Sequence, residues 1–448
     1  MKRRTMFIAA AIVAIAGTTV LTSAASASPR GVAATHVRTL AGTQSYLASL
    51  GIDAHTVVIQ RGARNYAGPK CPGVGWTCTT AKRVLQDGGD NEVDCTPGTG
   101  SVVGDTQSCT IVQVGSENSA RCSERSSSDA AVQDCNITQS GVRNEATVAQ
   151  AVEANGGPVQ SADQTIEVTQ TAAAGGNNDL NVLQHVHQHT QATGGQSQDV
   201  HQELTSSQVG AGTGNNSAQV KQDQNQDEHN GVSQAQNTNS GGATPCWTFP
   251  ASNPNQCANI SQTTDAGNNQ NRLDQSIDED AESNVATDQG QGSFSGGING
   301  HVELAAGTGA SHNDAKQRKS QTAKGPTGAS QQQIDPMGCC SFSANGNSRS
   351  TETLSQSSTQ NASAGAAAFQ QLEIDGSANS PLGSCMITQK ARNNSASSNF
   401  SGPGQLSPCP FLALTTSCTS GGGGEAPTTG SGSCSAFQGG EDAVPRRR

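Results

Sequence analysis

Three histidines at alternate positions are the residues of this chain whose spacing best suits metal binding. His185, His187 and His189 would project from one face of an extended strand at intervals of about 7 Å, and imidazole is a ligand of Zn²⁺ and Cu²⁺. Their parity is opposite to that of Val182 and Gln184, so we expect the histidine face to be the outer one. The nearby sequence has no carboxylate pattern to orient the rings, so these are weak metal candidates in a chain expected to bind no metal.

Other chemical motifs are sparse. The acidic run from Asp278 to Asp280 lacks the glycine of a calcium-binding loop, and we expect a solvated turn there. The chain has no serine elbow, no His-Glu-x-x-His pair and no glycine-rich nucleotide loop. We therefore expect a protein that is not an enzyme and has no cofactor. The isoelectric point of about 5.2 and an aromatic content of 3% argue against nucleic-acid binding.

A repeat of strand–turn–strand units would position any such side chains. The window that starts at Cys109 superposes on the window that starts at Cys135, with Gln113 on Gln139. The shared pattern is Ile-x-Gln, a turn, and then Asn-x-Ala-x-Val-x-Gln. Looser copies follow with longer turns, and their Gln and Asn positions are Gln170, Asn178, Gln184, Gln208, Asn216, Gln222, Gln262, Asn269, Gln275, Gln389 and Asn394.

The period inside each copy is two, which is typical of a β-strand. One face carries small apolar groups together with Gln and Asn, and the other face is polar and variable. A single unit buries too little to be stable, whereas stacked units would bury a continuous interior. Amides can lie in that interior if identical side chains hydrogen-bond along the stack as ladders.

The run from Gln139 to Gln150, written Gln-x-Gly-x-x-Asn-x-Ala-x-Val-x-Gln, resembles the curlin repeat of bacterial curli fibre subunits. That resemblance implies an exported chain of stacked strand–turn–strand units that assembles into cross-β fibres for adhesion and the biofilm matrix. It also implies that the following are ladder residues: Gln113, Asn118, Gln139, Asn144 and Gln150. This chain differs from the family in its irregular spacers and many cysteines, which favour a capped monomer over an open-ended polymer.

All 14 cysteines follow residue 27, and their even number in an exported chain favours disulfides. Cys109 and Cys135 occupy equivalent positions, so a bridge between neighbouring coils fits the stack, although the sequence leaves the connectivity open. The disulfide candidates are Cys71, Cys78, Cys109, Cys122, Cys135, Cys246, Cys257, Cys409 and Cys418.

The chain divides into four predicted segments. Residues 1–27 have a basic start, an apolar run and small residues at the end, which is typical of a secretory signal peptide and predicts a secreted or cell-surface protein. Residues 28–108 are expected to form an N-terminal cap that contains Cys and Trp. Residues 109–405 form the Gln/Asn-rich repeat region, and residues 406–448 a Gly/Ser/Cys-rich tail. No other stretch predicts a transmembrane segment.

Only 32% of the 448 residues are hydrophobic, which excludes a conventional globular core for the whole chain. We predict an all-β fold, a parallel β-solenoid stapled by disulfides. The expected function is that of an exported structural or adhesive protein that associates with itself or with surface and matrix components. The alternative is an extracellular binding module for polysaccharide or another ordered surface. Two other readings are a β-helix enzyme, for which no grouped charges appear, and disorder, which the period of two opposes.

Overall fold

The computed structural model describes most of the chain between residues 40 and 438, and it describes side chains, with gaps, up to residue 320. The described ranges are 40–96, 106–193, 195–229, 233–236, 256–282, 291–294, 298–324, 330–337, 340–346, 351–362, 367–374, 377–379, 384–393, 396–400, 411–420 and 436–438. The predicted signal peptide lies outside them. In the described part of the chain, no helix combines the length and the apolar character needed to cross a membrane.

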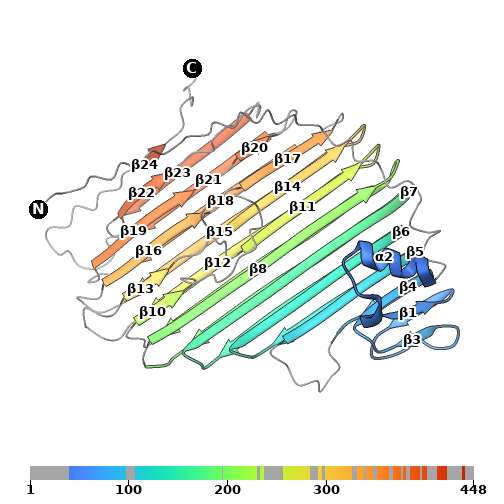
Figure 1. The fold of residues 1–448 in the computed structure, drawn as a ribbon. Helices are drawn as coiled ribbons and strands as arrows, with labels where there is room; N and C mark the ends of the chain where they lie inside the picture. Colours follow the sequence, from blue (N-terminus) through green and yellow to red (C-terminus); the bar gives the residue numbers. More distant parts are fainter. Residues whose placement is uncertain are drawn as a thin grey trace, which may run out of the picture.

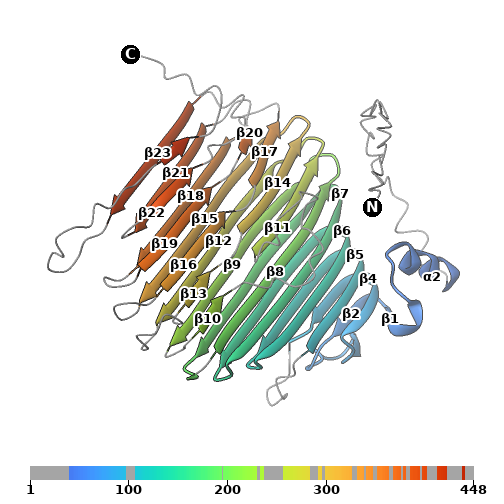
Figure 2. The same ribbon diagram turned by 60° about the vertical axis from the view of Figure 1, so that its left-hand side comes forward.

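The fold is a stack of β-arches, which we call coils, joined side by side by parallel pairing. Strand β6 (Ala130–Asn155) shows the plan, with a first arm before the bend at Gly141 and a second arm after it. The two arms face each other, because Gln139 Nε2 donates to the main-chain oxygen of Glu145 across the bend at 2.9 Å. Figures 1 and 2 show successive coils lying next to one another in chain order. The predicted all-β parallel solenoid is confirmed.

Eight coils carry described side chains. Coil 1 is β1 (Val58–Arg61) with β2 (Arg64–Ala67), coil 2 is β4 (Arg83–Asp94), coil 3 is β5 (Thr106–Ser126), coil 4 is β6, coil 5 is β7 (Val159–Thr190), coil 6 is β8 (Gly195–Gly210) with β9 (Asn215–His229), coil 7 is β10 (Ser233–Gln236), β11 (Gln256–Thr264) and β12 (Asn269–Glu282), and coil 8 is β13 (Gln291–Phe294), β14 (Ile298–Ala306) and β15 (Ser311–Lys324).

Parallel pairing continues toward the C-terminus. The later strands are β16 (Ser330–Met337), β17 (Cys340–Gly346), β18 (Thr351–Ala362), β19 (Ala367–Ile374), β20 (Ser377–Asn379), β21 (Ser384–Asn393), β22 (Ala396–Phe400), β23 (Phe411–Ser420) and β24 (Ala436–Gln438). Strand β23 pairs with β21, so strand pairing extends past residue 405, where we expected a tail to begin.

The stack also begins earlier than residue 109. Strand β4 pairs with β5 from Arg83 onward, and β1 and β2 pair with β4, so residues 58–94 supply two coils. Short strand β3 (Thr77–Thr79) pairs with the free edge of β2. Helix α2 (Leu40–Ser49) and the 3-10 helix η1 (Ala54–Thr56) precede them. Leu47 of α2 packs on the outer side of the first arms, against Leu85, Val112 and Val114.

The interior alternates aliphatic and amide layers. Ile111 and Ile137 stack in register in the main apolar cluster near the bend. A second small cluster, which contains Val152 and Val186, lies farther along the arms. Buried glutamines lie between the two clusters along each arm, because every second residue points inward. This layering lets a chain with few apolar residues fill its interior.

Glycines at the bend are required by stacking. A Cβ placed on Gly115 would lie 1.8 Å from the main-chain oxygen of Gly88, and a Cβ on Gly141 would lie 2.0 Å from that of Gly115. Real Cβ atoms do not approach an oxygen so closely, so coils 3 and 4 need glycine at this position, whereas coil 5, with a longer bend, carries Ala172 there.

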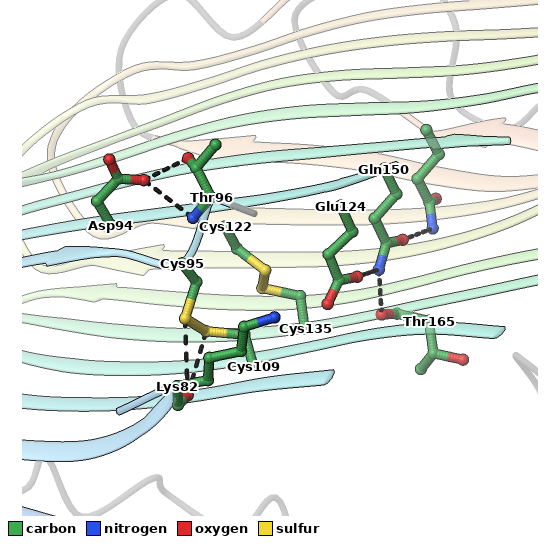
Figure 3. The surroundings of a disulfide bond; sticks show 11 residues. Lys82, Asp94, Cys95, Thr96, Cys109, Cys122, Glu124, Cys135, Gln150 and Thr165 are labelled. Atoms are coloured by element: carbon green, nitrogen blue, oxygen red, sulfur yellow. Dashed lines mark hydrogen bonds between the residues drawn. A yellow bond between two sulfur atoms is a disulfide. The ribbon is translucent and has the colours of Figure 1, made fainter. Parts of the chain in front are cut away.

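Three described disulfides staple the N-terminal coils. Cys71 and Cys78 close a loop beside β3. Cys95 joins Cys109, and Cys122 joins Cys135, so each bond links the second arm of one coil to the first arm of the next (Figure 3). Cys109 and Cys135 are in register, as expected from their equivalent sequence positions. Cys257 is also disulfide-bonded.

Candidate functional site: amide ladders and an outer histidine row

A ladder of glutamine amides runs along the inside of the first arms. Each Nε2 donates to the Oε1 of the preceding coil at 2.6–2.9 Å and to a main-chain oxygen of its own coil at 2.9–3.1 Å. Both amide hydrogens are therefore used, which offsets the cost of burying the group. The members of this first ladder are Gln60, Gln86, Gln113, Gln139, Gln170, Gln208 and Gln262.

An asparagine ladder runs next to it, at the start of the second arms. Each Nδ2 donates to the Oδ1 of the following coil at 2.8–2.9 Å, so the donor direction is opposite to that of the glutamine ladder. The members are Asn65, Asn91, Asn118, Asn144, Asn178, Asn216 and Asn269.

Two further glutamine ladders lie farther from the bend. One occupies the second arms with Nε2–Oε1 distances of 2.7–3.1 Å, and its members are Gln150, Gln184, Gln222, Gln275 and Gln317. The other occupies the first arms at 2.8–2.9 Å, and its members are Gln133, Gln164, Gln202 and Gln256.

The structure thus places the expected ladder positions from Gln113 to Gln275 in buried columns. Gln389 lies in β21 and Cys418 in β23, where side chains are not described, and three candidates lie outside the described residues, namely Asn394, Cys246 and Cys409. The sequence analysis missed the ladder that begins at Gln133. Its signal was a second glutamine six residues before each first-ladder glutamine from Gln113 onward, as in Gln133 and Gln139.

The two glutamine ladders of the first arms end where the register meets an aliphatic residue. Gln262 pairs with Leu304 and Gln256 with Ile298, and the Oε1 atoms of both glutamines are buried without a hydrogen-bond partner. At the opposite end of the stack, Asn65 Oδ1 is also buried and unpaired. In each ladder every amide donates toward one end of the stack, so the oxygen of the amide at the other end has no donor.

The N-terminal end of the first glutamine ladder is capped by backbone. Gln60 Nε2 donates to the main-chain oxygen of Thr77 in β3 at 2.7 Å, which takes the place of a preceding glutamine. Trp76 in the same disulfide-closed loop packs edge-on against Tyr66, with ring centroids 6.4 Å apart. The loop therefore covers the N-terminal edge of coil 1 at the position where a preceding coil would lie.

The three predicted histidines lie on the outer face of the second arms, as their parity required. His185 Nε2 and His187 Nδ1 face the two carboxylate oxygens of Glu153 in coil 4, at 3.6 and 3.4 Å. On the opposite side, His185 Nδ1 faces Asp223 at 3.3 Å and His187 Nε2 faces Asp227 at 3.5 Å, both from coil 6. The sequence analysis missed these acids because variable bends separate them from the histidines along the chain.

His189 stands apart from this group. Its ring lies 5.5 Å from the ring of His229, which in turn faces Glu282 at 3.5 Å. Among the described residues, no three His, Cys, Asp or Glu side chains are placed to hold a metal ion. Ser276 Oγ donates to Asp223 at 2.7 Å and not to an imidazole. Ser276 is therefore not arranged as a nucleophile that a histidine activates.

Comparison with family models, curated proteins and solved structures finds no match for this chain.

Proposed function

We propose that this protein is an exported structural or adhesive protein of the cell surface or extracellular matrix, with curlin-like repeats. The observation that carries the proposal is the continuity of the amide ladders through coils 1 to 7. The same register repeats from coil to coil, and the ladder side chains in the interior hydrogen-bond neighbouring coils to one another. Such a stack is suited to a structural role, because many hydrogen bonds have to break before neighbouring coils separate.

Export is supported by the signal-like residues 1–27 together with the disulfides, which persist in oxidising compartments. Self-association is supported by the stack itself, because a coil of a second molecule can pair in the same parallel register with the last coil of the first. The loop around Thr77 opposes growth at the N-terminal edge by occupying it.

The test is to express the full chain in an exporting host, collect the mature protein and measure three outcomes. We expect it outside the cytoplasm, with oxidised cysteines, and adherent to cells or assembled into structures with cross-β spacings of about 4.8 and 10 Å. Cytoplasmic retention, or a secreted monomer without adhesion, would contradict the proposal.

A second candidate is a binding module for polysaccharide, which is favoured by one surface. The outer face of the first arms carries a column of hydroxyl groups at one register position, formed by Thr138, Thr169, Ser207 and Ser261. Coils repeat at about 4.8 Å, so the column presents a regular polar row. Co-sedimentation with cellulose or chitin tests this function. Thr169→Val with Ser207→Ala should abolish that binding, and fibre formation should be unaffected.

A further inference from the structure

Five side chains on the outer face of the second arms form one continuous chain of opposite charges. The order is Asp223, His185, Glu153, His187 and Asp227, with neighbouring nitrogen and oxygen atoms 3.3–3.6 Å apart. They come from three consecutive coils. Strand pairing sets this arrangement, since Glu153 is in register with His187, and His185 with Asp223.

Both ring nitrogens of each histidine face a carboxylate. A neutral imidazole has one N–H and one lone pair, so one of its nitrogens would point a lone pair at a negatively charged oxygen. An imidazolium has two N–H groups and satisfies both sides. The arrangement of His185 and His187 is therefore complete only when the two rings are protonated.

The surrounding charges favour the protonated form. The pKa of His185 is raised, chiefly by its hydrogen bond with Asp223, while burial and Lys221 oppose the rise. In return, the hydrogen bond from His185 holds the pKa of Asp223 well below its usual range. From coil 7, Asp280 is in register with Asp227, and Asp278 has a pKa raised chiefly by burial and further by acids that include Asp227.

The remaining titratable neighbours lie at the margins. His189 is in register with Asp227, its ring lies 5.5 Å from that of His229, and His229 faces Glu282. In the adjacent column, Asp274 is paired with Arg318 at 3.0 Å. Lys221 is thus the one basic side chain that acts on His185 among the described residues, and it contacts Asp223 at 3.4 Å.

We propose that these five side chains form a proton-operated clasp, which ties coils 4, 5 and 6 together when the surroundings become acidic and loosens when they become alkaline. The clasp does not depend on the proposed structural function. It gives the outer face of the stack a response to pH through groups that take no part in the internal ladders.

The test uses the full oxidised mature protein and hydrogen exchange of the amides of β7. Relative to the amides of β14 in the same sample, which report the global change in stability, we expect protection factors of residues 181–189 to be about threefold to tenfold higher at pH 5.5 than at pH 8, because protonation gives the imidazole a second N–H and a positive charge between two carboxylates. The change has this sign since a histidine with a raised pKa stabilises the fold below its titration range and loses that effect above it.

Two variants and one control isolate the clasp. His187→Gln and Glu153→Gln should each reduce the pH-dependent gain by half or more, whereas His55→Gln, an exposed histidine on η1, should leave it unchanged. Equal pH dependence in the wild type and in both variants would overturn the proposal.

Added Zn²⁺ distinguishes the remaining alternative. If Zn²⁺ at micromolar concentration raises protection at pH 8 in the wild type but not in His187→Gln, the group is a metal site and the proton-operated clasp is wrong. We expect Zn²⁺ to have no such effect.

Discussion

Glu124 Oε2 accepts a hydrogen bond of 2.9 Å from Gln150 Nε2, and the two residues occupy the same register position of adjacent coils (Figure 3). Glu124 begins the glutamine ladder of the second arms, in which every amide donates toward the N-terminus. The first member of such a ladder has to accept and has no preceding side chain to receive its own hydrogens. A carboxyl group accepts and carries at most one hydrogen of its own, whereas an amide would bring two.

This buried carboxyl should make stability depend on pH. Burial raises the pKa of Glu124 from 4.5 to about 8, so between these values the folded protein keeps a proton that the unfolded chain releases. Stability should therefore fall as pH rises from about 5 to 9, by about 3–4 kcal/mol, and change little further from this group above that range. Glu124→Gln should flatten this slope in urea unfolding. The exposed Glu117→Gln is the control, and an identical slope in Glu124→Gln would refute the assignment.

The interior and the end of the first ladder should respond differently to loss of an amide. Gln139→Leu leaves Gln113 without a donor and Gln170 without an acceptor, which should cost about 2–5 kcal/mol. Gln262→Leu removes an already unpaired Oε1 beside Leu304, so its cost should be about 1–2 kcal/mol smaller. Urea unfolding of the two variants compares them directly, and equal costs would show that the ladder is not cooperative.

Gly115→Ala should disrupt the bend. Its Cβ would meet the main-chain oxygen of Gly88 at 1.8 Å, so the coils have to separate locally, at a cost of about 1–3 kcal/mol or more. Gly195→Ala is the matched control, because its Cβ has no neighbour within 4 Å. Thermal unfolding followed by circular dichroism checks this, and equal melting temperatures for both variants would contradict the stacking argument.

The staple at Cys122 and Cys135 should be replaceable by the residues that follow it in the stack. The next coils carry Val148 and Ile166 at these register positions. Losing the bond should cost about 3 kcal/mol for a loop of this size. Cys122→Val with Cys135→Ile should recover about 2 kcal/mol relative to the double serine variant, because the apolar layer is kept. Guanidinium unfolding of the two double variants measures the difference, and equal stability would refute it.

Much of the register could be predicted because the inward positions alternate regularly. The spacing of Asn178 and Gln184 matches that of Asn216 and Gln222, and the structure stacks these pairs directly. Coils 1 and 2 escaped detection because the loop from Cys71 to Cys78 interrupts the pattern between Asn65 and Asn91.

The outer histidine row could be predicted only in part. Alternation along one strand is enough to place His185 and His187 on a common outer face. Their partners Glu153 and Asp223 belong to other coils, and the offset between coils depends on bend lengths that a single sequence does not fix. Contacts within a coil were therefore accessible from the sequence, while contacts between outer faces of different coils required the structure.

The spacing of the ladders along the chain has a consequence for engineering. From Gln113 onward, consecutive members of the first ladder are 26, 31, 38 and 54 residues apart, yet their hydrogen-bonded Nε2 and Oε1 atoms remain 2.6–2.8 Å from one another. Extra sequence is thus accommodated at the ends and interruptions of the arms. Residues 237–255, between β10 and β11, fall at such an interruption. A foreign peptide inserted between β10 and β11 should therefore leave the hydrogen-bonded glutamine ladder intact.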